Sequence, residues 1–186
     1  KIFDHKNSLK NLINDQYFEN FSLFNFDEII FTDKAPLNFK WIGFIKIFFP
    51  NSKIVYCKRD PKDNCLSLYK NNFSSLTMNW SFNQKDISNF YNHHSFLMKF
   101  WYSKIPKSIH TVEYEKIVSD KENEIKKLLE FCELEWDDNC FNHHKNTKTP
   151  IKTVSISQAR EPVYNSSVNS SDNYKKYLNE MFENLI

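Results

Sequence analysis

Glycine is nearly absent from this sequence, in which Gly43 is the single example. Phosphate-binding loops of the G-x-x-x-x-G-K-[ST] and G-x-G-x-x-G types need several glycines, because backbone N–H groups must approach the phosphate closely. Both types of loop are therefore excluded. A phosphate group could be bound here only by side chains and by helix N-termini.

Long apolar runs and paired cysteine motifs are missing as well. No stretch approaches the roughly 20 apolar residues of a membrane-spanning helix, and the start does not resemble a signal peptide. No C-x-x-C motif occurs, and each cysteine falls within an apolar pattern, so we expect reduced core thiols in a cytoplasmic protein. The cysteines are Cys57, Cys65, Cys132 and Cys140.

Strong charge and obvious metal ligands are also lacking. The net charge of +2 is too small to indicate a nucleic-acid partner by itself. The adjacent pairs His93–His94 and His143–His144 would diverge on a helix, so we expect no metal site. What the sequence does contain is the apolar content of a folded protein, 40% hydrophobic and 17% aromatic in 186 residues. This length favours one domain over residues 1–186.

Short apolar strands alternate with helical patterns along the chain, which indicates an α/β fold with a parallel sheet. Within the runs at 27–32 and 53–58, the segments EIIF and KIVYC read as continuous apolar runs, as in interior strands covered on both faces. We expect a polar loop at 72–85, and the irregular stretch 145–172 is long enough to suggest a functional loop. Strands are expected at 27–32, 53–58 and 109–113, and helices at 8–24, 38–49, 60–71, 86–103, 122–132, 137–143 and 172–186.

Three segments carry side chains suited to an anion. Lys34 follows the first expected strand, at the sheet edge where α/β proteins bind ligands. Arg59 ends the second strand, and Ser67 lies eight residues later in the next helix; a guanidinium and a hydroxyl suit a phosphate. Residues 154–168 carry Arg160 and several hydroxyls. Each segment has a plainer interpretation: a solvated lysine, a strand-end arginine beside Asp60, or an ordinary loop.

Taken in order, these motifs resemble one family. They read T-D-K-x-P-x-N-F, then R-D-P-x-D-x-x-x-S-x-Y, then V-x-Y-E-x-[IV]-V, and finally V-S-x-x-Q-x-R-x-P-V-Y-x-S-S. This order is similar to that of sulfotransferases that use 3′-phosphoadenosine 5′-phosphosulfate (PAPS), above all the tyrosylprotein sulfotransferases and the bacterial branch associated with tetratricopeptide repeats. The resemblance implies a three-layer, P-loop-NTPase-like fold with a parallel sheet.

The resemblance also implies residue roles. Arg59, Ser67 and Arg160 match residues that bind the 3′-phosphate of PAPS, and Tyr114 matches a tyrosine of the nucleotide pocket. Lys34 matches the lysine that stabilises the transferring sulfuryl group. Ser155 or Ser157 matches a serine near the bridging oxygen. The stretch 145–172 is then expected to cover the cofactor.

The sequence departs from the family's pattern in several places. The family's 5′-phosphosulfate loop, expected upstream of Thr32, is not found, nor is the catalytic base that follows it. Asn71 stands where the animal enzymes have an arginine, and residues 168–171 lack the tryptophan of bacterial relatives. We therefore expect the chain to correspond to the C-terminal two-thirds of such a domain, truncated at the N-terminus, and whether it is an enzyme by itself stays open.

Two functions remain in competition. The first is a metal-independent sulfotransferase, or a fragment of one, that transfers a sulfuryl group from PAPS to a hydroxyl or amine of a small molecule, a glycan or a protein tyrosine. The second is an inactive domain that binds 3′-phosphoadenosine nucleotides or serves as an interaction module. A kinase-like P-loop protein is disfavoured, because no Walker lysine is present. Loss of a neighbouring strand would leave an unpaired sheet edge, so we also expect self-association.

Overall fold

The computed structural model describes residues 30, 32–73, 75–145 and 161–186. The chain divides into two compact units, residues 1–54 and residues 55–186. The boundary falls within the first strand of the sheet, directly after its first residue. The expected helix at 8–24 lies outside the described residues.

The 1–54 unit contains the expected helix at 38–49 as two consecutive elements, the 3₁₀ turn η1 (Asn38–Lys40) and the helix α2 (Ile42–Phe48). The Lys46 ammonium ends α2 by donating hydrogen bonds to the carbonyl oxygens of Pro50 (2.5 Å) and Ser52 (2.7 Å). Neither Ile30 nor Thr32 is in a strand, and Ile30 is 60% exposed, so a buried strand is not found at these positions.

A parallel sheet of two strands, β1 (Ile54–Lys58) and β2 (Ile109–Glu113), is formed by the described residues. Both strands were expected from their β-branched and aromatic residues. The protein is therefore of mixed α/β class but mostly helical. Self-association through an open sheet edge stays a prediction.

Helices pack on the sheet through aromatic contacts. Tyr56 of β1 packs against α4 (Gln84–Lys104), with its ring centroid 5.4 Å from that of His94. His110 of β2 stacks at 5.1 Å on Phe131 of α6 (Lys121–Cys132). The alternate residues of β1 are exposed, Val55 at 40% and Cys57 likewise. The expectation that β1 is covered on both faces, and that Cys57 is a core thiol, is therefore wrong.

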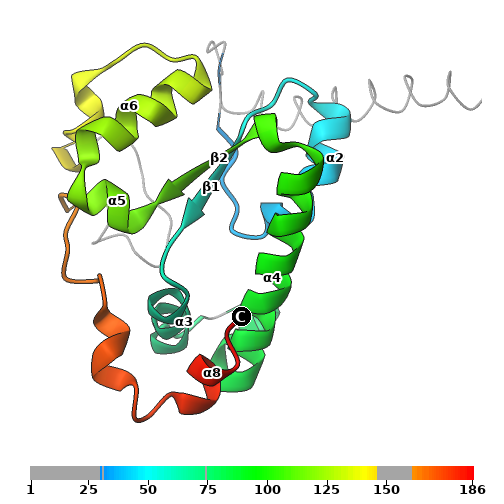
Figure 1. Ribbon diagram of the computed structural model, residues 1–186, viewed down its shortest axis with the longest axis vertical. Coiled ribbons are helices and arrows are strands. Elements are labelled where there is room, and N and C mark those ends of the chain that lie inside the picture. The colour runs from blue at the N-terminus through cyan, green and yellow to red at the C-terminus, as the bar shows by residue number, and fades with distance from the viewer. Residues whose placement is uncertain (1–29, 31, 74, 146–160) are drawn as a thin grey trace, which may run out of the picture. The chain divides into compact units, whose positions relative to one another are not determined.

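Helices lie beside the two strands in the 55–186 unit (Figure 1). The expected helices at 60–71, 86–103 and 122–132 are confirmed as α3 (Pro61–Lys70), α4 and α6. The 3₁₀ turn η3 (Pro106–Ser108) connects α4 to β2. The short helix α5 (Tyr114–Ser119), which begins directly after β2, was not expected.

The sequence overestimates regular helix towards the C-terminus. In place of a helix at 137–143 there are two single turns, η4 (Asp138–Cys140) and η5 (His143–Lys145). In place of a helix over 172–186 there are η6 (Ser170–Tyr174) and α8 (Asn179–Glu183). The expected loop at 72–85 contains a 3₁₀ helix, η2 (Leu76–Phe82).

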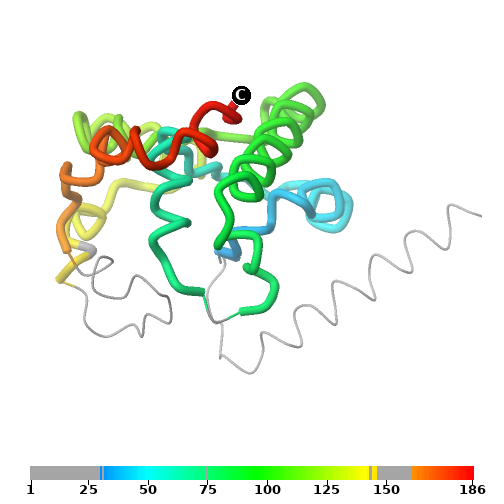
Figure 2. The backbone as a smooth tube through the Cα atoms, turned by 90° about the horizontal axis from the view of Figure 1, so that it is seen from below, coloured from blue at the N-terminus to red at the C-terminus, as the bar shows by residue number. Residues whose placement is uncertain are grey.

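The hydrophobic core of this unit lies where α3, α4 and α8 meet. Its buried members come from α3 and α4 and from the segment around α8, which lies beside α4 in both views (Figure 1 and Figure 2). Trp80 of η2 packs against this cluster and stacks on Phe90 with a centroid distance of 3.9 Å. The cluster consists of Cys65, Leu66, Ile87, Tyr91, Leu178, Met181 and Phe182.

Candidate functional site

The carboxyl ends of the two parallel strands lie side by side, which is where α/β proteins bind ligands. Arg59 and Asp60 follow β1, and Tyr114 and Glu115 follow β2. The backbone N–H of Asp60 donates a 2.8 Å hydrogen bond to Oε1 of Glu115, which ties the two strand ends together. The candidate site is built on this junction.

The helix α3 starts here because its first turn is well capped. Oδ1 of Asp60 accepts hydrogen bonds from the backbone N–H groups of Lys62 (2.9 Å) and Asp63 (3.0 Å). Pro61 occupies the first helical position, where a missing N–H costs nothing. This cap fixes the position of Arg59, the residue directly before it.

Arg59 stacks on Tyr114 and reaches the C-terminal segment. Its guanidinium carbon lies 5.3 Å from the centroid of the Tyr114 ring, within the range of a cation–π contact. Nη2 donates a 2.5 Å hydrogen bond to the carbonyl of Ser167 and lies 3.9 Å from Oδ2 of Asp63. Nε is buried and has no hydrogen-bond partner among the described residues. An unpaired buried donor of this kind calls for an explanation.

Tyr114 holds the same segment from the other strand end. Its hydroxyl donates a 2.6 Å hydrogen bond to the carbonyl of Tyr164. Burial raises the pKa of Tyr114, and the nearby Tyr164 adds to this, whereas Arg59 opposes it. Tyr114 therefore remains a neutral donor at physiological pH.

Asp63 is a member of the site that the sequence reasoning missed. The side chain is fully buried on α3, and its two oxygens accept hydrogen bonds from residues 169–171. An acid in the first turn of a helix is usually read as a partner of the helix dipole. The signal that could have identified it is its place in the motif R-D-P-x-D, one turn after Arg59.

The other expected site residues are distributed as follows. Ser67 is half-buried on α3, one turn beyond Asp63 and on the same face. Lys34 is exposed on irregular backbone in the 1–54 unit. Ser155, Ser157 and Arg160 lie outside the described residues. The structure thus brings Arg59 and Tyr114 together and places Ser67 on α3, the helix that follows Arg59.

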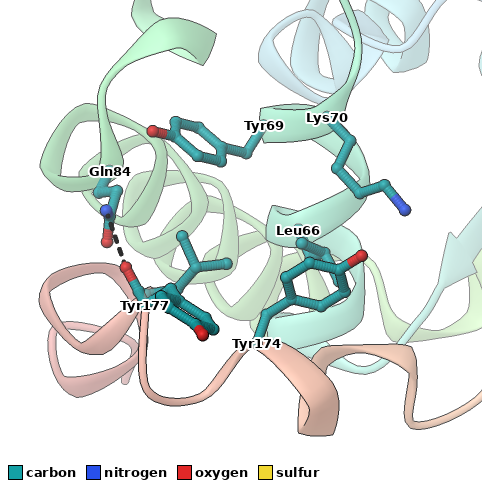
Figure 3. A pocket seen from close by; sticks show the side chains of 7 residues that line it. Leu66, Tyr69, Lys70, Gln84, Tyr174 and Tyr177 are labelled. Carbon is teal, nitrogen blue, oxygen red and sulfur yellow. Dashed lines mark hydrogen bonds between the residues drawn. The ribbon is translucent and has the colours of Figure 1, made fainter.

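A separate pocket of about 370 Å³ lies between α3, the start of α4 and the C-terminal segment (Figure 3). Three tyrosine rings, those of Tyr69, Tyr174 and Tyr177, line it around Leu66, and the ammonium of Lys70 lies 5.5 Å from the Tyr174 ring. Gln84 closes one side by donating to the carbonyl of Tyr177 at 3.3 Å. Nothing in the sequence reasoning pointed to this pocket.

Neither a metal-binding cluster nor a helix able to span a membrane is found in the described residues. Among them, no group of three or more His, Cys, Asp or Glu side chains is placed to hold a metal ion. Within the same residues, no helix is both long enough and apolar enough to cross a membrane.

Comparison with known proteins identifies relatives. A model of the sulfotransferase family matches residues 3–138, a range that includes Lys34, Arg59, Ser67 and Tyr114 and ends before Ser155. An uncharacterized protein of Aquifex aeolicus (strain VF5) is 39% identical over 153 residues, which are 81% of this chain and 20% of that protein. The chain thus spans about one fifth of the length of this relative.

Proposed function

Because this chain belongs to the sulfotransferase family, we propose that it binds the 3′-phosphate end of PAPS through Arg59 and Ser67. We propose further that it takes part in sulfuryl transfer to a hydroxyl or amine acceptor. The two-stranded sheet would then be part of the three-layer arrangement implied by the family resemblance.

The unpaired Nε of Arg59 is the observation that carries this proposal. The guanidinium sits at the carboxyl end of β1 and stacks on the Tyr114 ring, and in the part of the chain that the structure describes one of its buried N–H groups has no acceptor. A phosphate oxygen would supply that acceptor in a charge-assisted hydrogen bond. The residues present therefore fit a phosphate group.

The remaining residues take roles around this anchor. The Ser67 hydroxyl would donate one hydrogen bond to the same phosphate, and Tyr114 would border the nucleotide. Arg160 would add a second guanidinium to the phosphate. Lys34 would stabilise negative charge on the sulfuryl group, and Ser155 or Ser157 would lie near the bridging oxygen.

PAPS supplies the sulfuryl group that the acceptor receives. The contribution of this chain would be binding and orientation, since positioning and charge stabilisation dominate such transfers. Binding at the remote 3′-phosphate can orient the reacting end of the nucleotide. With a single glycine in the sequence, we assign no residue of this chain to the 5′-phosphosulfate.

The experiment is calorimetric titration with 3′-phosphoadenosine 5′-phosphate and with adenosine 5′-phosphate, which lacks the 3′-phosphate. The wild-type chain should prefer the first ligand, and Arg59→Ala should lose about 1.5–3 kcal/mol of binding free energy together with the preference. Lys99→Ala, which removes an exposed positive charge from α4, serves as the matched control and should change neither. Equal wild-type affinity for the two nucleotides would overturn the proposal.

A further inference from the structure

All of the hydrogen bonds given for the Asp63 carboxylate come from the C-terminal segment, and Nη2 of Arg59 lies 3.9 Å from Oδ2. Oδ2 accepts the backbone N–H of Asn169 at 2.7 Å, and Oδ1 accepts the backbone N–H of Ser171 at 2.8 Å. The Ser170 hydroxyl adds a longer bond of 3.3 Å to Oδ1. Burial of a carboxylate is costly unless both oxygens are satisfied, and here the segment satisfies both.

The backbone of the segment is shaped to receive this carboxylate. Asn169 has φ 57° and ψ 21°, a left-handed conformation that asparagine tolerates better than most residues. Backbone with such a residue can point neighbouring N–H groups at one anion. In a chain with so little glycine, asparagine is the natural residue for this turn.

The same segment supplies both contacts that fix the candidate phosphate site. The carbonyl of Ser167 accepts from Arg59, and the carbonyl of Tyr164 accepts from Tyr114. Asp63, which lies one turn from Arg59 on α3, holds the next residues of the segment. Figure 1 shows the segment, in orange, passing beside α3.

We propose that Asp63 is a positioning residue for nucleotide binding, one that holds Asn169–Ser171 and thereby keeps residues 164–167 against Arg59 and Tyr114. This inference rests on the proposed function. It makes nucleotide binding and ordering of the 164–171 segment mutually dependent, since a coupling between two events is reciprocal. Two backbone N–H groups and the Arg59 guanidinium stabilise the negative charge of Asp63.

Asp63→Asn is the sharpest variant, because it keeps the shape and replaces one accepting oxygen by an NH₂ group. Either Asn169 or Ser171 would then face a donor instead of an acceptor. Ser170→Ala is the matched mild variant, which removes only the longest of the three bonds. Amide hydrogen exchange of the nucleotide-free chain reports on the contact between Asp63 and residues 169–171, here called the clamp, without any ligand.

We expect Asp63→Asn to speed exchange at the amides of residues 169 and 171 by about tenfold or more, a loss of about 1.4 kcal/mol of local protection. The preference for 3′-phosphoadenosine 5′-phosphate over adenosine 5′-phosphate should fall by a similar factor, while the affinity for adenosine 5′-phosphate stays unchanged. Ser170→Ala should change each quantity by less than about threefold. If Asp63 served only the stability of the fold, the substitution would lower the affinity for both nucleotides equally.

The wild-type chain provides a second test that needs no variant. Adding 3′-phosphoadenosine 5′-phosphate should slow amide exchange across residues 164–171. If the nucleotide binds and exchange there is unchanged, or if Asp63→Asn keeps the full preference for the 3′-phosphate, the positioning role is wrong. If the wild type binds neither nucleotide selectively, the proposed function fails, and the exchange result in the nucleotide-free chain still decides whether the clamp exists.

Discussion

The Tyr114 hydroxyl donates a 2.6 Å hydrogen bond to the Tyr164 carbonyl, 50 residues further along the chain. The ring of the same tyrosine lies under the Arg59 guanidinium. One side chain therefore joins the end of β2, the end of β1 and the C-terminal segment. Its hydroxyl and its ring make different contacts, so substitution can separate their contributions.

Replacing Tyr114 by phenylalanine removes the hydroxyl and keeps the ring. We expect Tyr114→Phe to lower the free energy of unfolding by about 0.5–1.5 kcal/mol, the usual net value of one hydrogen bond. Tyr114→Leu should cost about 0.5–1 kcal/mol more, because the cation–π contact is also lost. Urea denaturation of the three proteins measures both steps. Equal stability of Tyr114→Phe and the wild type would show that the bond to Tyr164 contributes nothing.

Stability should depend on pH through His94. Its ring lies 5.4 Å from the Tyr56 ring and 5.8 Å from the Tyr91 ring, and burial lowers the pKa of His94 from its ordinary 6.5. The unfolded chain then binds the proton more readily than the folded chain. The contribution to stability is complete above about pH 6.5 and is lost as the pH falls through the lowered pKa.

His94→Phe keeps an aromatic ring at this position and removes the titrating group. We expect it to flatten the decline in the free energy of unfolding between about pH 6.5 and pH 5, measured by urea denaturation at a series of pH values. An unchanged slope in the variant would assign the acid sensitivity to other groups.

The four cysteines are free thiols, and two of them should differ sharply in reactivity. Cys57 is exposed on β1, whereas Cys65 is fully buried on α3. Burial, reinforced by the nearby Asp60, raises the pKa of the Cys65 thiol to about 12. Because the thiolate is the reactive form, iodoacetamide at pH 8 should modify Cys57 first. Peptide mass spectrometry measures the rate at which each cysteine is modified. Equal rates for Cys57 and Cys65 in the folded protein would contradict the prediction. In guanidinium chloride, the two rates should become similar.

Met181 should be a large contributor to stability. Its side chain is completely buried in the cluster formed by α3, α4 and α8. We expect Met181→Ala to cost about 2–5 kcal/mol, the usual range for truncating a buried side chain. Ile186→Ala, at a position that is 87% exposed, is the control and should change stability by less than about 0.5 kcal/mol. Denaturant midpoints compare the two variants with the wild type. A similarly small loss of stability in both variants would show that α8 does not contribute to the core.

Elements with strong local signals were predictable from the sequence. The capping carboxylate of Asp60 with Pro61 sets the start of α3, and the Asn83 side chain caps α4 by accepting from the N–H of Asp86 at 3.1 Å. In such caps, the side chain and the backbone group that it binds are only two or three residues apart, so the pattern can be recognised in the sequence. Such patterns also placed Arg59 and Ser67 correctly relative to β1 and α3.

The C-terminal region was not predictable because distant residues determine it. Leu178, Met181 and Phe182 have helical spacing, yet the helix begins only at Asn179. The side chain of Gln84 takes the place of helical hydrogen bonds there, accepting from the N–H of Met181 at 3.4 Å and donating to the carbonyl of Tyr177. In the candidate site, the partners of Asp63 were hidden for the same reason, since 106–108 residues separate them from it.

The core position of α8 also has a consequence for synthesis of the protein on the ribosome. Residues 178, 181 and 182 complete a cluster begun at Cys65, so the part of α3 and α4 that they cover stays exposed until residue 182 has left the exit tunnel. At about 5–20 residues per second, the more than 110 intervening residues take about 6–23 s to add. A chain that ends shortly before residue 178 would lack these residues, and the part of the α3–α4 surface that they cover would stay exposed.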